Sequence, residues 1–260
     1  MTKEQFYLTL KERFQSLLQA EQIENETLSV ACRALTPEEA IGNTERRDFP
    51  ILTGKDVMIQ AEYKEAKGQA FTDAPATYTG TLKDILKMDI LSNPRERSIF
   101  IAAVNAVMAF MEKCKGTVHC RKEGPEQCAQ DMQHYLEAHY PEVRKIALIG
   151  YQPALLEMLS TSSYEVRVLD LNPDNIGQIR YGICVEDGEL AKDEIKNHYA
   201  QLILCTGSTI CNGSIVDYLD LKQDVLFFGT SAARAAALLG LKRVCFAEKY
   251  IDTIQDLWYI

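Results

Sequence analysis

Residues 145–170 read KIALIGYQPALLEMLSTSSYEVRVLD, and this stretch decides the fold. Two short apolar runs, 145–150 and 165–170, flank a segment with helical spacing at 153–160. The first run shows no alternation of polar and apolar residues, which is typical of a strand in a parallel sheet covered on both faces. The stretch therefore predicts a strand–helix–strand unit.

The same rhythm of strand-like and helical segments continues to the end of the chain. Further strands are predicted at 201–207, 224–230 and 243–248, and further helices at 192–199, 215–219 and 232–239. Such a rhythm predicts a doubly wound parallel sheet with helices on both faces, so the C-terminal part should be a Rossmann-like α/β domain.

The N-terminal part mixes both kinds of element. The predicted elements are a helix over 3–22, strands at 27–35 and 57–63, and a short helix at 81–88. Residues 64–80 are rich in Gly, Ala, Pro and Thr and predict a long loop. We therefore expect a smaller α+β domain over 1–113 and the α/β domain over 114–260, with the boundary between 110 and 128.

A long apolar helix should begin after Asn93. This residue suits the N-cap, Pro94 suits the first helical position, and Glu96 completes a start that resembles a capping box. The helix is apolar all round and continues to about residue 113, which predicts a central element buried between layers.

Two polar residues of this helix are candidates for a site. A buried amide at Asn105 must be hydrogen-bonded, so it either ties the helix to a loop or faces a cleft between the domains. Arg97 would either meet an anionic ligand or, as is more usual for arginine, lie exposed to solvent.

Composition limits the class of protein. The chain has 260 residues, of which 47% are hydrophobic, enough to bury the core of one large domain or two smaller ones. Its formal net charge is −9. Such a charge repels phosphate groups, which argues against general nucleic-acid binding and against docking on an anionic membrane.

The sequence also bears on the cellular compartment. The first residues, MTKEQFYLTLKERF, lack the apolar segment of a secretory signal, and no apolar run reaches the length of about 18 residues that spans a bilayer. We therefore expect a cytoplasmic protein. Its eight cysteines should then be thiols or metal ligands rather than disulfides.

The loops after the first two predicted strands differ from those of dinucleotide-binding proteins. Gly150-Tyr151-Gln152-Pro153 is not GxGxxG, which argues against NAD or FAD. Asp170 stands where many such folds place a ribose-binding acid. It could equally be a turn or cap residue before Asn172-Pro173, and both interpretations stay open.

The most informative loop spans 206–214 and follows a buried strand. It offers hydroxyl, amide and glycine residues, namely Thr206, Gly207, Ser208, Thr209, Asn212, Gly213 and Ser214. Such a loop can hold an anion or an oxygen-rich ligand, and a helix cap would need only one of these residues, so we favour a site. Thr230 and Ser231 follow the next strand, where a cap explains them as well as a ligand does.

A cysteine-rich segment suggests a second kind of site. Cys114, His119, Cys120 and Cys128 offer thiolate and imidazole ligands for zinc or another soft metal, although the spacing matches no standard metal motif. Isolated structural cysteines are the alternative. Cysteines 184, 205 and 245 fall in strand-like runs and should be core residues.

Several motifs together resemble a heavy-metal chelation family of unknown function. They are, in chain order, GQAFTD (68–73), SNP (92–94), AAVNA (102–106), GTVHCR (116–121), KIALIG (145–150), TGST (206–209), NGS (212–214) and FGTS (228–231). The resemblance covers most of the chain from about residue 25 and is specific only in the combination of motifs.

The resemblance implies an N-terminal domain similar to that of enolases, a Rossmann-like C-terminal domain, and a site in the cleft between them. The matching cleft positions are Asn93, Arg97, Asn105, the 206–213 loop and Thr230. The chain departs from the family pattern at Thr230-Ser231-Ala232-Ala233, where relatives often carry a proline-containing loop.

The first hypothesis for function is therefore a protein that binds a metal or a metal-carrying small molecule. The cofactor it implies is a transition metal, with His119 and Cys120 as candidate ligands. The alternative is an enzyme that binds a nucleotide-like cofactor such as S-adenosylmethionine, with Asp170 on the ribose. A third hypothesis is a scaffold whose polar loops are only caps. The residues leave open whether a reaction is catalysed and whether a second copy of the chain is a partner.

Overall fold

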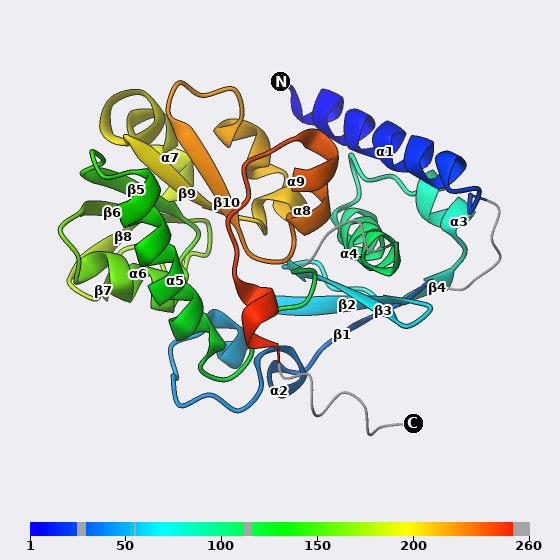
Figure 1. The fold of residues 1–260 in the computed structure, drawn as a ribbon, viewed down its shortest axis with the longest axis horizontal. Coiled ribbons are helices and arrows are strands. Elements are labelled where there is room, and N and C mark those ends of the chain that lie inside the picture. Colours follow the sequence, from blue (N-terminus) through cyan, green and yellow to red (C-terminus); the bar gives the residue numbers. More distant parts are fainter. Residues whose placement is uncertain (25–29, 55, 112–115, 252–260) are drawn as a thin grey trace.

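The computed structural model describes residues 1–24, 30–54, 56–111 and 116–251. Two sheets organise the molecule (Figure 1). One is antiparallel, with the order β3-β2-β1-β4, and consists of β1 (Val30–Ala34), β2 (Val57–Tyr63), β3 (Ala66–Thr72) and β4 (Tyr78–Gly80). The chain is therefore a mixed α/β protein with two separate sheets.

The second sheet has six strands in the order β10-β9-β5-β6-β8-β7. They are β5 (Lys145–Ile149), β6 (Glu165–Asp170), β7 (Ile179–Arg180), β8 (Ile183–Asp187), β9 (Leu202–Thr206) and β10 (Asp224–Phe228). All neighbouring strands are parallel except β7, which pairs with β8 in the antiparallel sense. The predicted parallel sheet is thus present, with one antiparallel edge strand.

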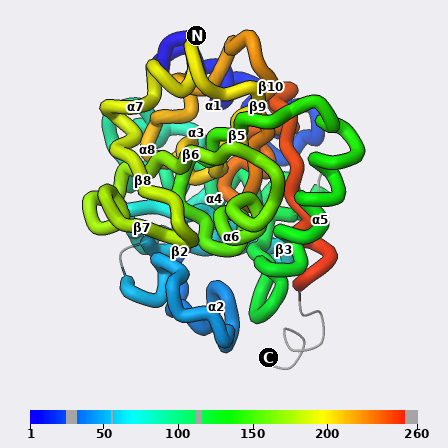
Figure 2. Tube along the Cα trace, turned by 90° about the vertical axis from the view of Figure 1, so that its left-hand side faces the viewer, coloured from blue at the N-terminus to red at the C-terminus, as the bar shows by residue number. Residues whose placement is uncertain are grey.

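Helices cover both sheets. They are α1 (Lys3–Ala20), α2 (Pro37–Ile41), α3 (Leu82–Lys87), α4 (Pro94–Phe110), α5 (Gly124–His139), α6 (Pro153–Ser160), α7 (Gly188–Glu194), α8 (Thr209–Asn212) and α9 (Ala233–Leu239). Short helical turns occupy Pro50–Thr53, Ile195–Tyr199, Ser214–Tyr218 and Ala247–Tyr250. In the turned view of Figure 2, α6 lies in front of the six-stranded sheet and the segment with α2 lies below it.

Helix α4 lies on the antiparallel sheet, with α8 and α9 of the other half beside it, and is buried on all sides from Arg97 to Met108, as its apolar sequence predicts (Figure 1). It packs directly on β3 at Gly68, where a Cβ atom would lie 2.1 Å from the backbone nitrogen of Ala106 and 2.4 Å from the carbonyl oxygen of Ala102. No other residue type could occupy position 68 without moving the helix. The close approach brings the middle of α4 to the ends of the neighbouring strands.

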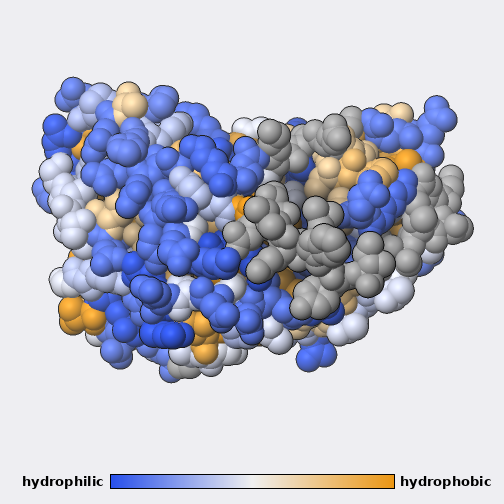
Figure 3. Space-filling view, turned by 60° about the horizontal axis from the view of Figure 1, so that its bottom comes forward, coloured by the Kyte–Doolittle hydropathy of each residue, from blue (hydrophilic) through white to orange (hydrophobic). Residues whose placement is uncertain are grey.

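One apolar core runs through both halves of the chain. Phe14 of α1 and Phe100 of α4 belong to the same buried cluster as Ile149 of β5 and Phe227 of β10. A second cluster lies under α5 and α6 on the other face of the six-stranded sheet. Hydrophilic side chains cover most of the outer face of that half in Figure 3. The two sheets are therefore joined by packing as well as by the chain.

Three sequence expectations were wrong in this part. Residues 64–80 are not a long loop, because β3 and β4 lie there. One of the small residues that suggested a loop, Gly68, is needed where α4 touches β3. Residues 243–248 form no strand beyond a single bridge from Arg243 to Phe227. Glu96 does not close a capping box, since its carboxylate accepts from the backbone N–H of Asp89 and the amide of Asn93.

The expected domain boundary near 113–114 lies outside the described residues, as does Cys114. Within the described ranges, no helix combines the length and apolar character that crossing a membrane requires. The cytoplasmic location stays a prediction.

Candidate functional site

A cavity of about 580 Å³ opens at the carboxyl ends of the parallel strands. Its position follows from the strand order. Strands β5 and β9 are neighbours, but the chain leaves β5 toward β6 and leaves β9 toward β10, on opposite sides. The loops that follow these two strands therefore diverge, and ligands of open α/β sheets bind in such a crevice. Residues of the N-terminal half, including Asp56 and Phe71, close the cavity from the other side.

Glycines let the strand-end loops come close together. Gly150 has φ +86°, and a Cβ atom there would lie 2.4 Å from Cγ2 of Thr206. A Cβ atom at Gly207 would lie 2.7 Å from the backbone nitrogen of Ala232. Position 150 requires glycine for two reasons, its left-handed backbone and the closeness of the Thr206 side chain. Position 207 requires glycine only because the backbone of Ala232 lies so close.

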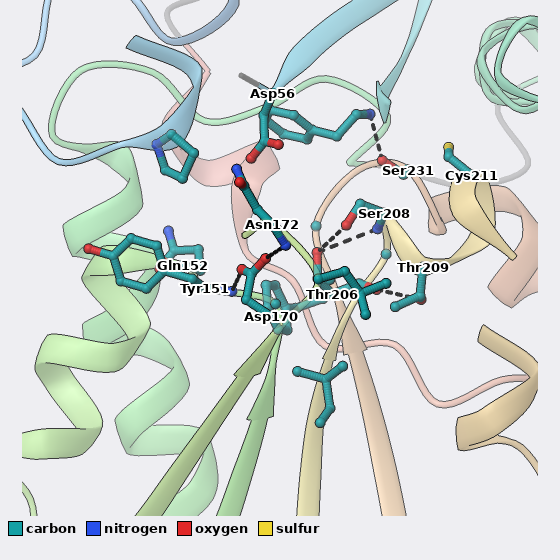
Figure 4. Close-up of a pocket in the computed structure, with 18 of the residues that line it drawn as sticks. Asp56, Tyr151, Gln152, Asp170, Asn172, Thr206, Ser208, Thr209, Cys211 and Ser231 are labelled. Carbon is teal, nitrogen blue, oxygen red and sulfur yellow. Dashed lines mark hydrogen bonds between the residues drawn. The ribbon is translucent and has the colours of Figure 1, made fainter. Parts of the chain in front are cut away.

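Asp170 fixes the shape of the cavity floor. One carboxylate oxygen accepts a hydrogen bond from the backbone N–H of Tyr151 at 2.7 Å, and the other accepts one from the backbone N–H of Asn172 at 2.7 Å (Figure 4). In these contacts Asp170 acts as a turn residue, because its carboxylate binds backbone N–H groups of the two neighbouring loops. Asn172 also lines the cavity, and its side-chain oxygen accepts from the backbone N–H of Asp174 at 3.0 Å.

The 206–214 loop lines the cavity, but most of its polar groups bond to one another. The hydroxyls of Thr206 and Ser208 lie 3.1 Å apart, and the hydroxyl of Thr209 donates to the carbonyl oxygen of Thr206 at 2.7 Å. The amide oxygen of Asn212 accepts from both the N–H and the hydroxyl of Ser214.

Gly207 belongs to the cavity lining, whereas Gly213 does not. Gly213, at φ +92°, ends α8, and a Cβ atom there would meet the side chain of Lys3. Gly213 is therefore turned away from the cavity, whereas the next residue, Ser214, lines it again.

Thr230 and Ser231 lie at the wall nearest to α4. The hydroxyl of Ser231 accepts from the backbone N–H of Phe71 at 2.9 Å, which joins this loop to β3. Thr230 is 1% exposed and lines the cavity, and in the part of the chain that the structure describes its hydroxyl has no hydrogen-bond partner. Buried hydroxyl groups normally form a hydrogen bond, so this hydroxyl is free to form one with a ligand in the cavity.

The three residues predicted from α4 do not line the cavity. Asn93 caps the helix, with its side-chain oxygen accepting from the N–H groups of Arg95 and Glu96. Asn105 is completely buried and ties the helix to neighbouring segments, which is the first of its two expected roles. Its amide donates to the carbonyl oxygens of Gln69, Thr230 and Ser231, so it supports the cavity wall from behind.

Arg97 is neither exposed nor placed to meet a ligand in the cavity. It is 2% exposed and donates to the carbonyl oxygens of Ile90, Leu91 and Cys211 at 2.6, 2.8 and 3.0 Å. Its guanidinium also lies 5.0 Å from the ring centre of Tyr7. The solvent-exposed alternative was wrong because these carbonyl groups replace water as hydrogen-bond partners.

Carboxylates dominate the charge of the cavity. Asp56 was not found from the sequence, since it belongs to no motif. Burial, and to a smaller degree the negative charges of Asp170 and Asp73, raise the pKa of the Asp56 carboxyl to about 6. Figure 4 shows Asp56 descending from the N-terminal half toward Asn172. The single lysine of the described lining, Lys192, is paired with Glu189 and Asp217 at 2.8 and 3.1 Å.

His119 and three cysteines form another part of the lining. Nδ1 of His119 lies 2.5 Å from the carbonyl oxygen of Cys120, so this nitrogen must carry the proton and Nε2 has a free lone pair. Burial lowers the pKa of His119, which keeps the ring neutral. The Cys128 thiol is hydrogen-bonded to the thiols of Cys120 and Cys245. Cys245 is thus half-buried at the cavity, whereas the sequence placed it in the core.

The described residues contain no group of three or more His, Cys, Asp or Glu side chains arranged to hold a metal ion. The ligand pair predicted from the sequence, His119 and Cys120, lies together at the cavity, at 3.8 Å between Nδ1 and the sulfur. Because Nδ1 is engaged by the carbonyl oxygen of Cys120, His119 would offer Nε2 to a metal, and this ligand pair stays a prediction.

Comparison with known proteins finds a family model that matches part of the chain. Residues 135–244 match DUF364, which is described as "Putative heavy-metal chelation". No curated protein matches the chain. Among solved structures, a protein of unknown function from the DUF364 family of Pyrococcus horikoshii is 19% identical, with a TM-score of 0.53 over 89% of this chain and 81% of that one.

A second member, from Desulfitobacterium hafniense DCB-2, also of unknown function, is 13% identical, with a TM-score of 0.47 over 70% of this chain and 71% of that one. The first likeness shows a common fold, and the second is too distant to add to it. Over residues 135–244 the chain is therefore similar to the DUF364 family.

Proposed function

We propose that the chain binds a small positively charged ligand, namely a metal-carrying small molecule, in the cavity between its two halves. The observation that carries the proposal is the charge of the lining. Its carboxylates are Asp56, Asp73, Asp170, Asp174, Glu189 and Asp217. Opposite them stand Lys192, which is already paired, and a neutral His119. Such a cavity attracts cations and repels phosphates and carboxylates.

Two features make the cavity suited to a ligand larger than a bare ion. Its volume of about 580 Å³ falls in the range of small-molecule sites. Thr230 offers a buried hydroxyl that a ligand's polar group could satisfy. The description of the DUF364 family as a chelation family agrees with a metal as part of the ligand.

The proposal includes the finer fold and domain assignment. We assign residues 1–113 to an enolase N-terminal-like domain and 114–260 to a Rossmann-like domain. The order β10-β9-β5-β6-β8, with its reversal between β5 and β9, supports the second assignment, because the ligand crevice of Rossmann-like folds lies at this reversal.

The test uses calorimetry with Co²⁺, Ni²⁺ and Zn²⁺, each alone and with an equimolar amount of histidine as a small chelating molecule. We expect a metal–histidine complex to bind more tightly than either component. Asp56→Asn should weaken binding about tenfold, which corresponds to about 1.4 kcal/mol. Asp193→Asn removes a carboxylate that is exposed and outside the cavity, and should leave binding unchanged.

Thr230→Val provides a second variant, because valine keeps the shape of threonine and removes only the hydroxyl. Since this hydroxyl has no partner among the described residues, the variant should fold as stably as the parent and bind the complex more weakly. Equal binding by parent, Asp56→Asn and Thr230→Val would overturn the proposal, as would tighter binding of an anion such as phosphate.

A further inference from the structure

Three thiols from separate segments meet at one side of the cavity. Cys120 lies in the loop before α5, Cys128 lies in α5 itself, and Cys245 lies between the bridge at Arg243 and the last helical turn. All three line the cavity and none is in a disulfide. The middle thiol, Cys128, is hydrogen-bonded to the other two. Contact between thiols so distant in sequence is a property of the fold rather than of a local turn.

The segments that carry these thiols are held in place. The side chain of Arg243 donates to the carbonyl oxygens of Gly229 and Gly116 at 3.0 and 2.9 Å, and the backbone N–H of Val244 donates to Phe227 at 2.9 Å. These bonds fix the position of Cys245 against α5. Preformed ligands lose little freedom on binding an ion, which favours affinity.

The surroundings suit a singly charged soft ion. Hydrogen bonding to Cys128 and burial raise the pKa of the Cys245 thiol well above its usual value, and the guanidinium of Arg243 opposes this only in part. This thiol is therefore neutral until an ion displaces its proton, and the ring of His119 is neutral as well. Cys120 is 5% exposed, whereas Cys128 and Cys245 are half-buried, so an ion in the cavity can reach them. Thiolates are the ligands that select Cu⁺ over harder ions.

We propose that Cys128 and Cys245 bind a Cu⁺ ion through their two sulfurs, at the thiol-lined side of the ligand cavity. Two thiols each lose one proton to solvent, two S–Cu bonds form, and the copper keeps its oxidation state. Two sulfurs suffice for Cu⁺, which is stable in linear coordination, whereas a structural zinc site needs four ligands. Cys120 lies beside the pair and is hydrogen-bonded to Cys128. This inference rests on the proposed function, since it adds a metal site made of the chain's own side chains to the same ligand cavity.

The test titrates reduced, metal-free protein with Cu⁺ under anaerobic conditions, in competition with bathocuproine disulfonate. We expect one Cu⁺ per chain, with absorption from thiolate-to-copper charge transfer. Cys128→Ser and Cys245→Ser should each weaken binding by more than about 100-fold, since even loss of a residue that only orients a ligand costs about 10- to 100-fold. Cys184→Ser, which removes an exposed thiol outside the cavity, should bind as the parent does.

Circular dichroism and thermal melting of each variant separate loss of ligands from loss of fold. Where either serine variant is unstable, the alanine variant at the same position replaces it. Binding that survives in both Cys128 and Cys245 variants, or that disappears in Cys184→Ser, overturns the inference. Asp56→Asn distinguishes the two proposals, because it should weaken the metal–histidine complex and leave Cu⁺ on the thiols. If the parent protein binds Cu⁺ but not the metal–histidine complex, the proposed function has failed; if it binds the complex but not Cu⁺, the copper site has failed.

Discussion

The side-chain oxygen of Asn105, in the middle of α4, accepts a hydrogen bond from the backbone N–H of Arg234 at 3.1 Å. The amide nitrogen of the same side chain donates to three carbonyl oxygens, two of them from the cavity loop at Thr230 and Ser231. One buried residue of the N-terminal half thus fixes both the start of α9 and the loop before it. It supports the cavity without touching a ligand.

Asn105→Ala should therefore be strongly destabilising. The change leaves a buried N–H and several carbonyl groups without their partner, at a cost of about 3 kcal/mol in the free energy of unfolding. Urea denaturation followed by circular dichroism measures it. Asn43→Ala, at an exposed position, should change stability by less than about 0.5 kcal/mol. Equal stability of the two variants would contradict the role given to Asn105.

Gly150→Ala should cost more than an ordinary substitution of a left-handed glycine. The new Cβ atom would meet Cγ2 of Thr206 at 2.4 Å, in addition to the backbone strain at φ +86°. We expect about 3 kcal/mol for Gly150→Ala. Gly240→Ala, at φ +71° with open space around it, should cost only about 1 kcal/mol.

A second substitution isolates the steric part of this effect. Thr206→Ser removes the methyl group that the new Cβ atom would meet, so the double variant Gly150→Ala/Thr206→Ser should regain part of the lost stability. Thermal melting of the four proteins forms a double-mutant cycle. If the two substitutions changed the stability by strictly additive amounts, the clash between the new Cβ atom and Thr206 would be relieved in another way.

Asp56 should make stability depend on pH. Its folded pKa of about 6 lies above the ordinary value of 3.8, so the ionised carboxylate destabilises the fold above pH 6. The penalty disappears as the pH falls from 6 toward 4, because the folded protein takes up the proton first. Asp56→Asn should raise the free energy of unfolding by about 1 to 3 kcal/mol at pH 7.5 and by much less at pH 4. A constant difference at both pH values would contradict this.

Arg46 holds the segment before β2 against the helices of the other half. It forms ion pairs with Glu126 of α5, Glu157 of α6 and Asp48, and only 15% of its side chain is exposed. Because several partially buried carboxylates lose their partner at once, Arg46→Ala should cost about 2 kcal/mol.

Arg33 is the matched control. Its ion pair with Glu39 is exposed on both sides, so Arg33→Ala should cost less than about 1 kcal/mol. Urea denaturation of the two variants measures the difference. The following residues, Phe49 and Ile51, line the cavity, so ligand dissociation measured by stopped flow should also be faster in Arg46→Ala. Equal effects of the two variants on stability would contradict a special role for Arg46.

The sequence predicted the elements that depend on local pattern. Strand β2, strand β6 and helix α6 begin and end where the pattern placed them, since their apolar spacing follows from their own burial. The element β3 was missed because Gly68 is required by a helix that lies far away in the chain. Local composition cannot distinguish such a glycine from one in a loop.

The cavity was only partly predictable for a similar reason. Strand-end loops could be placed at one edge of the sheet, because parallel strands share that edge. The contribution of Asp56 and the meeting of Cys128 with Cys245 depend on how the two halves pack, and no motif encodes that packing. Arg97 shows the opposite error. Its side chain has the chemistry to bind an anionic ligand, but its N–H groups donate to three backbone carbonyl oxygens instead.

The apolar cluster shared by α1, α4, β5 and β10 has a mechanical consequence. Rotation of one half against the other would tear Phe100 and Phe227 out of a common core, so the cavity cannot be opened by a hinge between the sheets. The peripheral segment between α2 and β2 has a small apolar cluster of its own, separate from this core, and polar bonds of Arg46 and Asp48 join it to the other half. Access must instead come from this segment. A ligand can therefore enter or leave when this peripheral segment moves, while the core that joins the two halves stays folded.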